Sequence, residues 1–231
     1  MVNETRVVGL IPVRGGSKSI PKKNQQLLGG VPLMVWPIKT GLATPEIDRL
    51  IVSSDDSVLR SIAIKNGAEA YERSNNLALD ESLVVDVVRD LWRKLKSEGE
   101  SAKILVLLEA TSPFRTPELV SHCLNRLVSE KLDSIATFQE ASVNPERTWK
   151  MVNEKPRPFI EGAIPWKPRQ LLTDAYQLDG KVYAFYPDRL PNNAPSLLFG
   201  NVGAEITRGS NAIDIDTTSD LETANAILKN R

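Results

Sequence analysis

The sequence has one cysteine and one histidine in 231 residues. Cys123 therefore has no partner for an internal disulfide, which is typical of proteins in reducing compartments. His122 is its neighbour, and the pair shows no His/Cys spacing typical of structural zinc. A chain of this length buries about 70% of its surface on folding, so it needs no such crosslinks. We predict a domain held by its hydrophobic core, with Cys123 as a small buried residue of a helix over 119–128.

The chain also lacks a charge excess and a long apolar run. Acidic and basic residues number 29 each, whereas nucleic-acid-binding domains usually show a clear basic excess. The apolar run at 7–13 is too short to span a membrane, and no small-residue cleavage site follows it. We expect a cytoplasmic protein with neither nucleic acid nor membrane as a partner.

Short apolar segments alternate with amphipathic ones through the first 140 residues. Strands are predicted at 6–13, 48–54, 103–110 and 134–139, and helices at 32–43, 55–67, 81–99 and 116–131. A further strand is predicted at 181–186, and 211–230 reads as a strand, a turn and a final helix. This order predicts an α/β fold with three layers and a mainly parallel central sheet. Ligands in such sheets bind at the carboxyl ends of the strands.

The segment from about 140 to 176 has a different texture. Prolines recur at 145, 156, 158, 165 and 168, mixed with charges and two tryptophans. This composition predicts an irregular arm rather than a separate unit. We therefore expect a single domain over 1–231 with an embedded arm.

A glycine-containing basic loop follows the first predicted strand. In IPVRGGSKSIPKKN, the cations are Arg14, Lys18, Lys22 and Lys23, and the adjacent glycines are Gly15 and Gly16. Glycine backbones adopt positive φ readily, and their N–H groups approach anions closely. The pattern is neither a Walker A loop nor GxGxxG. It favours a bound polyphosphate, although a solvated basic turn is the alternative.

Two aspartates alternate near the end of the chain. In NAIDIDTTSD, Asp214 and Asp216 would share one face of a strand. Mg²⁺ suits such a pair, because proteins hold it with a few carboxylates and substrate phosphates. The alternative is that Asp216 caps the following helix. A metal pair and a polyphosphate loop in one α/β fold together indicate nucleotidyl transfer.

Several motifs, taken in order, resemble those of the N-acylneuraminate cytidylyltransferases, also called CMP-sialic acid synthetases. They are IPVRGGSKSIPKKN, VSSDD, YERSNNLALD, LLEATSPFRT, LDGKVYAF and IDIDTTSDL, between about residues 7 and 229. The resemblance implies that CTP and a nonulosonic acid give a CMP-sugar and pyrophosphate, with Mg²⁺ as cofactor. It also implies a Rossmann-like nucleotide-diphospho-sugar transferase fold. The implied assembly is a homodimer in which each arm reaches over the partner's site.

The resemblance also assigns roles by position. Nucleotide contacts would come from Arg14, Gly15, Gly16, Ser17, Lys18, Lys23, Asn24, Arg73 and Asp80. The sugar side would include Glu109, Ser112, Arg169, Tyr176, Asp179 and Tyr183. Asp214 and Asp216 match metal-binding aspartates, and Lys23, Arg14 and Asp216 would carry the catalysis. Lys23 would stabilise the leaving pyrophosphate. For Arg115, in the loop after the central strand, a structural ion pair and a ligand contact are both open.

Two positions depart from the family pattern, which commonly has glutamine at 109 and asparagine at 179. Glu109 and Asp179 keep the shape of these amides, lose an N–H donor and add charge. We place both near the sugar and expect an acceptor with hydroxyls or a free amine where sialic acid carries an N-acyl group. The alternative is that water or Arg169 compensates.

Other functions remain open at this point. The acceptor can equally be 3-deoxy-manno-octulosonate or a pseudaminic or legionaminic type acid, because a few pocket side chains decide this. A non-catalytic nucleotide-binding homologue is a second possibility, which the aspartate pair disfavours. A kinase is a third possibility, which is disfavoured because the chain lacks the sequence context of a Walker A lysine. The general base is not His122 in our interpretation; a metal-activated hydroxyl and Asp216 both remain candidates.

Overall fold

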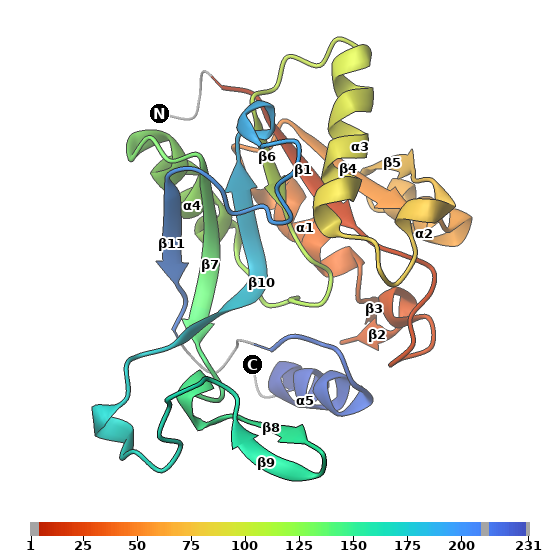
Figure 1. Cartoon of the computed structure of the whole chain (residues 1–231). Coiled ribbons are helices and arrows are strands. Elements are labelled where there is room, and N and C mark those ends of the chain that lie inside the picture. The colour runs from red at the N-terminus through yellow and green to blue at the C-terminus, as the bar shows by residue number, and fades with distance from the viewer. Residues whose placement is uncertain (1–4, 209–212, 230–231) are drawn as a thin grey trace.

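A computed structural model describes residues 5–208 and 213–229, and its centre is a seven-stranded sheet (Figure 1). The strand order is β11-β7-β10-β6-β1-β4-β5. The strands are β1 (Val7–Pro12), β4 (Arg49–Ser54), β5 (Glu69–Glu72), β6 (Ile104–Leu107), β7 (Ser134–Glu140), β10 (Tyr176–Phe185) and β11 (Val202–Ile206). Within the described residues, β10 alone runs antiparallel to its sheet neighbours. The predicted mainly parallel sheet is confirmed.

Helices cover both faces of the sheet. Helices α1 (Val35–Ala43), α2 (Ser57–Lys65) and α4 (Pro117–Ser129) pack with one set of strand residues, and α3 (Val84–Ser97) packs with the other. Strand β1 shows the division: Val7 and Ile11 join the first core, and Val8 and Leu10 join the second. Side chains that alternate along a strand point to opposite faces. The three-layer α/β prediction therefore holds, and Cys123 is buried in the first core.

The sequence sets where these helices begin. The Asp56 carboxylate accepts hydrogen bonds from the N–H groups of Val58 and Leu59, which caps α2. The Thr116 hydroxyl accepts from the Leu119 N–H, and Pro117 occupies the first position of α4, where its missing N–H costs nothing. The helices therefore start at fixed points beyond the carboxyl ends of the parallel strands.

The connectivity creates a switch point at β1. The chain goes from β1 through β4 to β5 on one side, and then returns to place β6 on the other side of β1. In open α/β sheets, ligands bind at the carboxyl ends of strands where the order reverses. The basic loop after β1 and the segment after β6 meet at this point.

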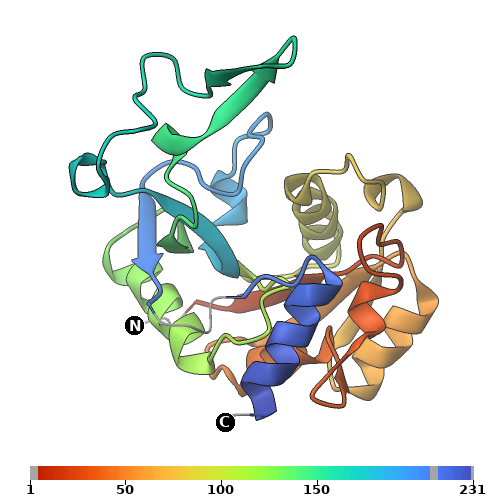
Figure 2. The ribbon, with the colours of Figure 1, turned by 90° about the horizontal axis from the view of Figure 1, so that it is seen from below.

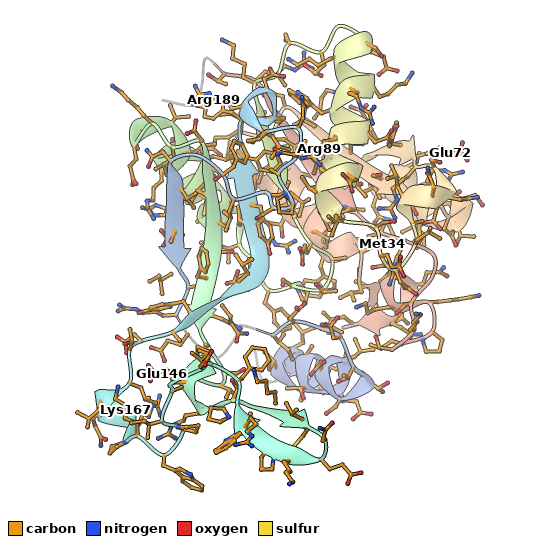
Figure 3. The ribbon with its side chains drawn as sticks, in the orientation of Figure 1. Met34, Glu72, Arg89, Glu146, Lys167 and Arg189 are labelled. Atoms are coloured by element: carbon orange, nitrogen blue, oxygen red, sulfur yellow. The ribbon has the colours of Figure 1, made fainter. Side chains whose placement is uncertain are left out.

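The segment between β7 and β10 forms an arm that projects from the body (Figure 2). It contains a two-stranded hairpin, β8 (Trp149–Val152) and β9 (Lys155–Pro158), so the prediction of an irregular arm missed this short sheet. Glu146 and Lys167 lie close together in the arm (Figure 3), with their charged atoms 3.8 Å apart, and Arg147 donates to the Lys167 carbonyl.

The end of the chain differs from its prediction. Residues 213–216 form no strand, so the strand predicted at 211–216 is wrong for these four residues. Residues 211–212 lie outside the described residues. Ile215 is nevertheless fully buried, and its N–H bonds to the Thr111 carbonyl at 2.8 Å. Helix α5 (Thr218–Lys229) follows as predicted.

Some elements were not predicted at all. They are β5, β11 and the small hairpin of β2 (Leu27–Leu28) and β3 (Val31–Pro32). Among the helices in the described part of the chain, none combines the length and the apolar run that crossing a bilayer requires.

Candidate active site

The basic loop is held by main-chain contacts at both ends. The Val13 N–H bonds to the Ser53 carbonyl at 3.0 Å, and the Asn24 side-chain amide donates to the Arg14 carbonyl at 2.9 Å. Arg73 donates to the Val13 carbonyl at 2.9 Å. These bonds fix the start of the loop against β4 and close its two ends on each other.

The two glycines behave differently from the prediction. Neither Gly15 nor Gly16 has a positive φ, whereas Lys22 does, at 52°. The Gly15 N–H bonds to the Asp55 carboxylate at 3.2 Å, so it is already paired. Gly15 is required by close packing instead: a Cβ there would lie 2.8 Å from Oδ2 of Asp56. Gly16 is exposed with open space around it.

Carboxylates already pair with the cations of the loop. Asp80 contacts Arg14 at 2.7 Å and Lys18 at 2.5 Å. These two cations hold the pKa of Asp80 below its usual range. Lys23 contacts Asp216 at 2.9 Å. In each contact a carboxylate lies where the phosphate oxygens of a nucleotide would be attracted.

The Lys23–Asp216 contact joins the start and the end of the chain. A small core of its own supports it, in which Ile20, Leu28 and Leu33 pack with Ile215 and Ala224. The Gly29 N–H also bonds to the Asn225 side chain of α5 at 3.0 Å. The basic loop and the acidic pair therefore meet at one edge of the sheet.

The acidic side is built around Thr111, directly beyond β6. Asp214 accepts a hydrogen bond from the Thr111 side chain. Loss of surrounding water raises the pKa of Asp214, and the charge of Asp216 adds to this. Asp216 does not cap α5, because the Thr217 hydroxyl accepts from the Asp220 N–H, and the Asp220 carboxylate in turn accepts from the N–H groups of Asp216 and Thr217. The Asp216 carboxylate is therefore left for Lys23 and for a ligand.

Two cavities open at this edge. One, of about 320 Å³, is lined by Arg14, Lys23, Asn24, Arg73, the loop 77–82, Val84, Val87 and residues 109–111. The other, of about 160 Å³, is lined by residues 83–85, Glu109, Leu178, Tyr183 and residues 195–198. The cavities share Val84 and Glu109. After the roles that the resemblance implies, we name the larger one, which includes the basic loop, the nucleotide cavity and the smaller one the acceptor cavity.

Glu109 stands on the wall between these cavities, and Arg115 fixes its main chain. Arg115 donates to the carbonyls of Glu109 and Gly180, so its role is structural. Burial raises the pKa of Glu109 to about 7, and Asp214 and Asp216 contribute, while Arg115 and Lys23 act in the opposite direction. Burial likewise raises the pKa of Tyr183, on the same cavity.

Asp179 does not face the acceptor cavity, so its placement near the sugar is corrected. Its side chain is 1% exposed and 3.0 Å from the Lys181 ammonium. The hydroxyls of Thr137 and Thr207 also donate to it, as does the Lys181 N–H. These bonds use its carboxylate oxygens, and none remains for a ligand.

Four further assigned residues make structural contacts or lie outside the two cavities at the sheet edge. Ser112 is buried and donates to the Asp179 carbonyl, which is a structural contact. Arg73 is 5% exposed and lies 3.6 Å from Asp55, so it mainly supports the basic loop, although its edge lines the nucleotide cavity. Arg169 lies in the arm, beside a cavity of about 350 Å³ that includes Arg147 and Glu140. Tyr176 begins β10 at the base of the arm and lines neither cavity at the sheet edge.

The carboxylates at the sheet edge are few, which bears on how they could hold Mg²⁺. Over residues 5–208 and 213–229, no group of three or more His, Cys, Asp or Glu side chains is arranged to hold a metal ion alone. Asp214 and Asp216 nevertheless lie close enough to raise the pKa of Asp214. One or two carboxylates that share the ion with phosphates are the usual set for Mg²⁺. The residues present therefore fit Mg²⁺ bound together with a nucleotide.

Reasoning from the sequence did not identify Thr111, Asp55 or Asp220. A sequence signal existed only for Asp220, because TTSD before an apolar run has the spacing of a capping box. Thr111 and Asp55 act through the main chain of segments distant in sequence, which no local pattern reveals.

A cytidylyltransferase family profile matches residues 8–183. The chain belongs to the cytidylyltransferase family. The match covers most of β1, the basic loop and β10 as far as Tyr183, and it confirms the resemblance found in the motifs. This protein is therefore a nucleotidyltransferase.

Curated relatives span nearly the whole chain. It is 29% identical over 221 residues to a CMP-N,N'-diacetyllegionaminic acid synthase of Legionella pneumophila, with 93% of each chain covered. It is 28% identical over 222 residues to a pseudaminic acid cytidylyltransferase of Campylobacter jejuni, with 95% of each covered. A Streptococcus agalactiae N-acylneuraminate cytidylyltransferase is 27% identical over 176 residues, or 75% of this chain and 42% of that one.

A solved structure shares the fold. A CMP-2-keto-3-deoxy-manno-octonic acid synthetase, solved with CTP, superposes with a TM-score of 0.71 at 20% identity and covers 98% of this chain and 99% of its own. The likeness confirms the predicted nucleotidyltransferase fold.

Proposed function

We propose that the protein transfers CMP from CTP to the anomeric hydroxyl of a nonulosonic acid, giving a CMP-sugar and pyrophosphate. The observation that carries this proposal is the meeting of Lys23 and Asp216 at 2.9 Å, with Lys23 on the wall of the nucleotide cavity. Phosphate-binding cations and metal-binding carboxylates are both needed where a phosphoanhydride breaks. The names of the relatives in Legionella and Campylobacter support an acceptor of this class.

The cleft divides between the two substrates. CTP occupies the nucleotide cavity, with its phosphates toward Arg14, Lys18 and Lys23, and Asn24 helps to hold the loop closed around them. The sugar acid occupies the acceptor cavity beside Glu109 and Tyr183. In this proposal the acceptor hydroxyl approaches the α-phosphate beside Val84 and Glu109, which line both cavities, because in-line attack requires the two groups to be close.

The chemistry follows from these positions. A bond forms between the acceptor oxygen and the α-phosphorus, the bond from that phosphorus to the bridging oxygen breaks, and the proton leaves to base or solvent. Lys23 stabilises the charge that builds on the leaving pyrophosphate. Asp214 and Asp216 would hold Mg²⁺, which neutralises phosphate charge when bound.

The arm belongs to the same proposal. Its exposed apolar residues include Met151, Phe159, Ile164 and Trp166, with Trp166 86% exposed. Isolated exposed apolar residues are common, but a concentration of them marks an association surface. We infer a homodimer in which the arm, with Arg169, reaches the acceptor side of the partner's cleft.

Pyrophosphate release tests the proposal. The purified protein with CTP and Mg²⁺ should release pyrophosphate only when a nonulosonic acid is added, across a panel of sialic, legionaminic, pseudaminic and 3-deoxy-manno-octulosonic acids. Lys23→Ala should lower kcat about 100-fold or more, with a smaller change in CTP affinity, because its contact strengthens as pyrophosphate departs.

Lys65→Ala is the matched control, because Lys65 is an exposed lysine at the end of α2. This variant should keep the wild-type kcat. No release with any acid of the panel would refute the proposed function, and an unchanged kcat in Lys23→Ala would refute the role of that lysine.

A further inference from the structure

The acceptor cavity is mostly apolar, with a single charged group on its wall. Its lining includes Leu83, Val84, Val85, Leu178, Pro195, Leu197 and Leu198, and its polar members are Ser196, Tyr183 and Glu109. Among the described residues that line it, Glu109 alone carries a charge. A half-buried carboxylate in such a wall is costly unless something donates hydrogen bonds to it.

The protein itself does not supply those donors. Within residues 5–208 and 213–229, no side chain or N–H group is hydrogen-bonded or ion-paired to the Glu109 carboxylate. Arg115 lies near it, but its Nη2 donates to the carbonyls of Glu109 and Gly180, and its buried Nε and Nη1 bond neither to the carboxylate nor to any other described group. The carboxylate therefore keeps its accepting capacity for a ligand.

The position of this carboxylate is set in advance. Arg115 fixes the main chain at Glu109, and the side chain lies against Gly180, whose φ is +68°. A Cβ at Gly180 would come within 2.9 Å of Oε2 of Glu109. Gly180 therefore leaves the space that the carboxylate occupies beside the cavity, and its positive φ disfavours a larger residue there.

We propose that Glu109 determines acceptor specificity by accepting a hydrogen bond from an N–H or O–H group on an otherwise apolar substituent of the sugar acid. This inference rests on the proposed function and names the acceptor's chemistry at one contact. An ionised carboxylate only accepts, so a substituent that presents only an acceptor atom leaves both groups unpaired. A glutamine at this position offers both a donor and an acceptor and is less selective.

The experiment compares pairs of acceptors that differ in one donor. Each hydroxyl group of a nonulosonic acid that the protein uses, except the reacting anomeric hydroxyl, is replaced in turn by its methyl ether. Each N-acyl N–H is replaced by its N-methyl amide, so that the donor is lost and only an acceptor remains. The ratio of kcat/KM within each pair is measured for the wild type, Glu109→Gln and Glu72→Gln. The pH is set well above 7, where Glu109 is ionised. Glu72 is an exposed residue outside both cavities (Figure 3), which makes it the matched control.

At one position of the sugar, methylation should lower the wild-type kcat/KM about 10- to 100-fold. Glu109→Gln should reduce that loss at least tenfold at the same position and at no other, while CTP binding stays intact. Glu72→Gln should reproduce the wild-type ratios. If the kcat/KM ratios of wild type and Glu109→Gln are equal at every position, the inference is overturned. The proposed function still stands in that case, because both proteins turn over the sugar acid.

Discussion

Asp179 and Lys181 form a charged pair buried inside the fold, and neither residue lines the nucleotide or the acceptor cavity. Their side chains are 1% and 9% exposed, and Thr137 and Thr207 complete the network. Burial alone would raise the pKa of Asp179, but hydrogen bonds from the two threonines and the charge of Lys181 together lower it. The net result is a buried charge that depends on all of its partners.

We expect Asp179→Asn to lower the free energy of unfolding by about 3 kcal/mol, because Lys181 would remain buried without its counter-charge. The double variant Asp179→Asn/Lys181→Met should recover at least half of this loss, because it removes both charges. Chemical denaturation measures both values. If the double variant is as unstable as the single one, the pair is not the source of the effect.

The same network gives stability a pH dependence. The pKa of Asp179 is lower in the folded protein than in the unfolded chain, so its contribution is present above the unfolded value of about 3.9 and is lost as pH falls through the folded value. The double variant should show a weaker loss of stability on acidification than the wild type.

At the scale of elements, the loop between β5 and α3 lies over the nucleotide cavity. It includes the 3-10 turn Asn75–Leu77 and Asp80, and residues 77–82 contribute to the cavity wall. Asp80 pairs with both Arg14 and Lys18, two of the cations that we propose bind the triphosphate. Under this proposal, CTP displaces the Asp80 carboxylate before these cations reach its phosphates.

We predict that Asp80→Asn strengthens CTP binding about three- to tenfold, since it removes a competing anion from exposed cations. Calorimetric titration of CTP should show this gain at low ionic strength and a smaller gain at high salt. Asp86→Asn, on the exposed side of α3, is a suitable comparison. Weaker binding in Asp80→Asn would instead mean that Asp80 contacts the nucleotide directly.

The strands and helices show how much of the fold could be predicted from the sequence. The alternation of strands and helices followed from local apolar periodicity, so the layers and the position of the basic loop were predictable. The weak strands β5 and β11 were not, because β5 is a four-residue edge strand with no buried residue and β11 has only one. Their pairing depends on neighbours distant in sequence.

Within the site, residues with motif positions were predictable as a group, but their individual contacts were not. Glu109, Lys23, Asp214 and Asp216 do come together at one sheet edge. The sequence could not show that Asp179 has a different role from Glu109. The difference arises from the backbone at Gly180, where the Asp179 carboxylate lies against Lys181. Arg73 was likewise predicted to contact a ligand, but in the structure its side chain supports the basic loop.

At the scale of the whole molecule, the arm and the cleft lie apart. The arm projects from the body (Figure 2), and Arg169 lies beside a cavity that contains none of the residues of the nucleotide or acceptor cavities. A role for Arg169 in this chain's own cleft would require the arm to fold back. A role in the partner's cleft requires only a closed twofold dimer, in which each arm has an equivalent site to reach.

Mixing two inactive variants tests that arrangement. Lys23→Ala damages the cleft that contains it, and Arg169→Ala damages the partner's cleft if the arm is shared. In a mixed dimer, the cleft of the Arg169→Ala subunit keeps its own Lys23 and receives the intact Arg169 of its partner. Random mixing should therefore restore about a quarter of the wild-type activity, since half of the dimers are mixed and each has one complete cleft.

Two further variants test whether the recovery of activity depends on the dimer. Trp166→Glu should abolish both the dimer, measured by sedimentation equilibrium, and the recovery of activity on mixing. Ile64→Glu changes an apolar residue of α2 that is 64% exposed, away from the arm, and should do neither. If mixing restores nothing although mixed dimers form, Arg169 acts within its own chain or outside catalysis, and the shared cleft is wrong.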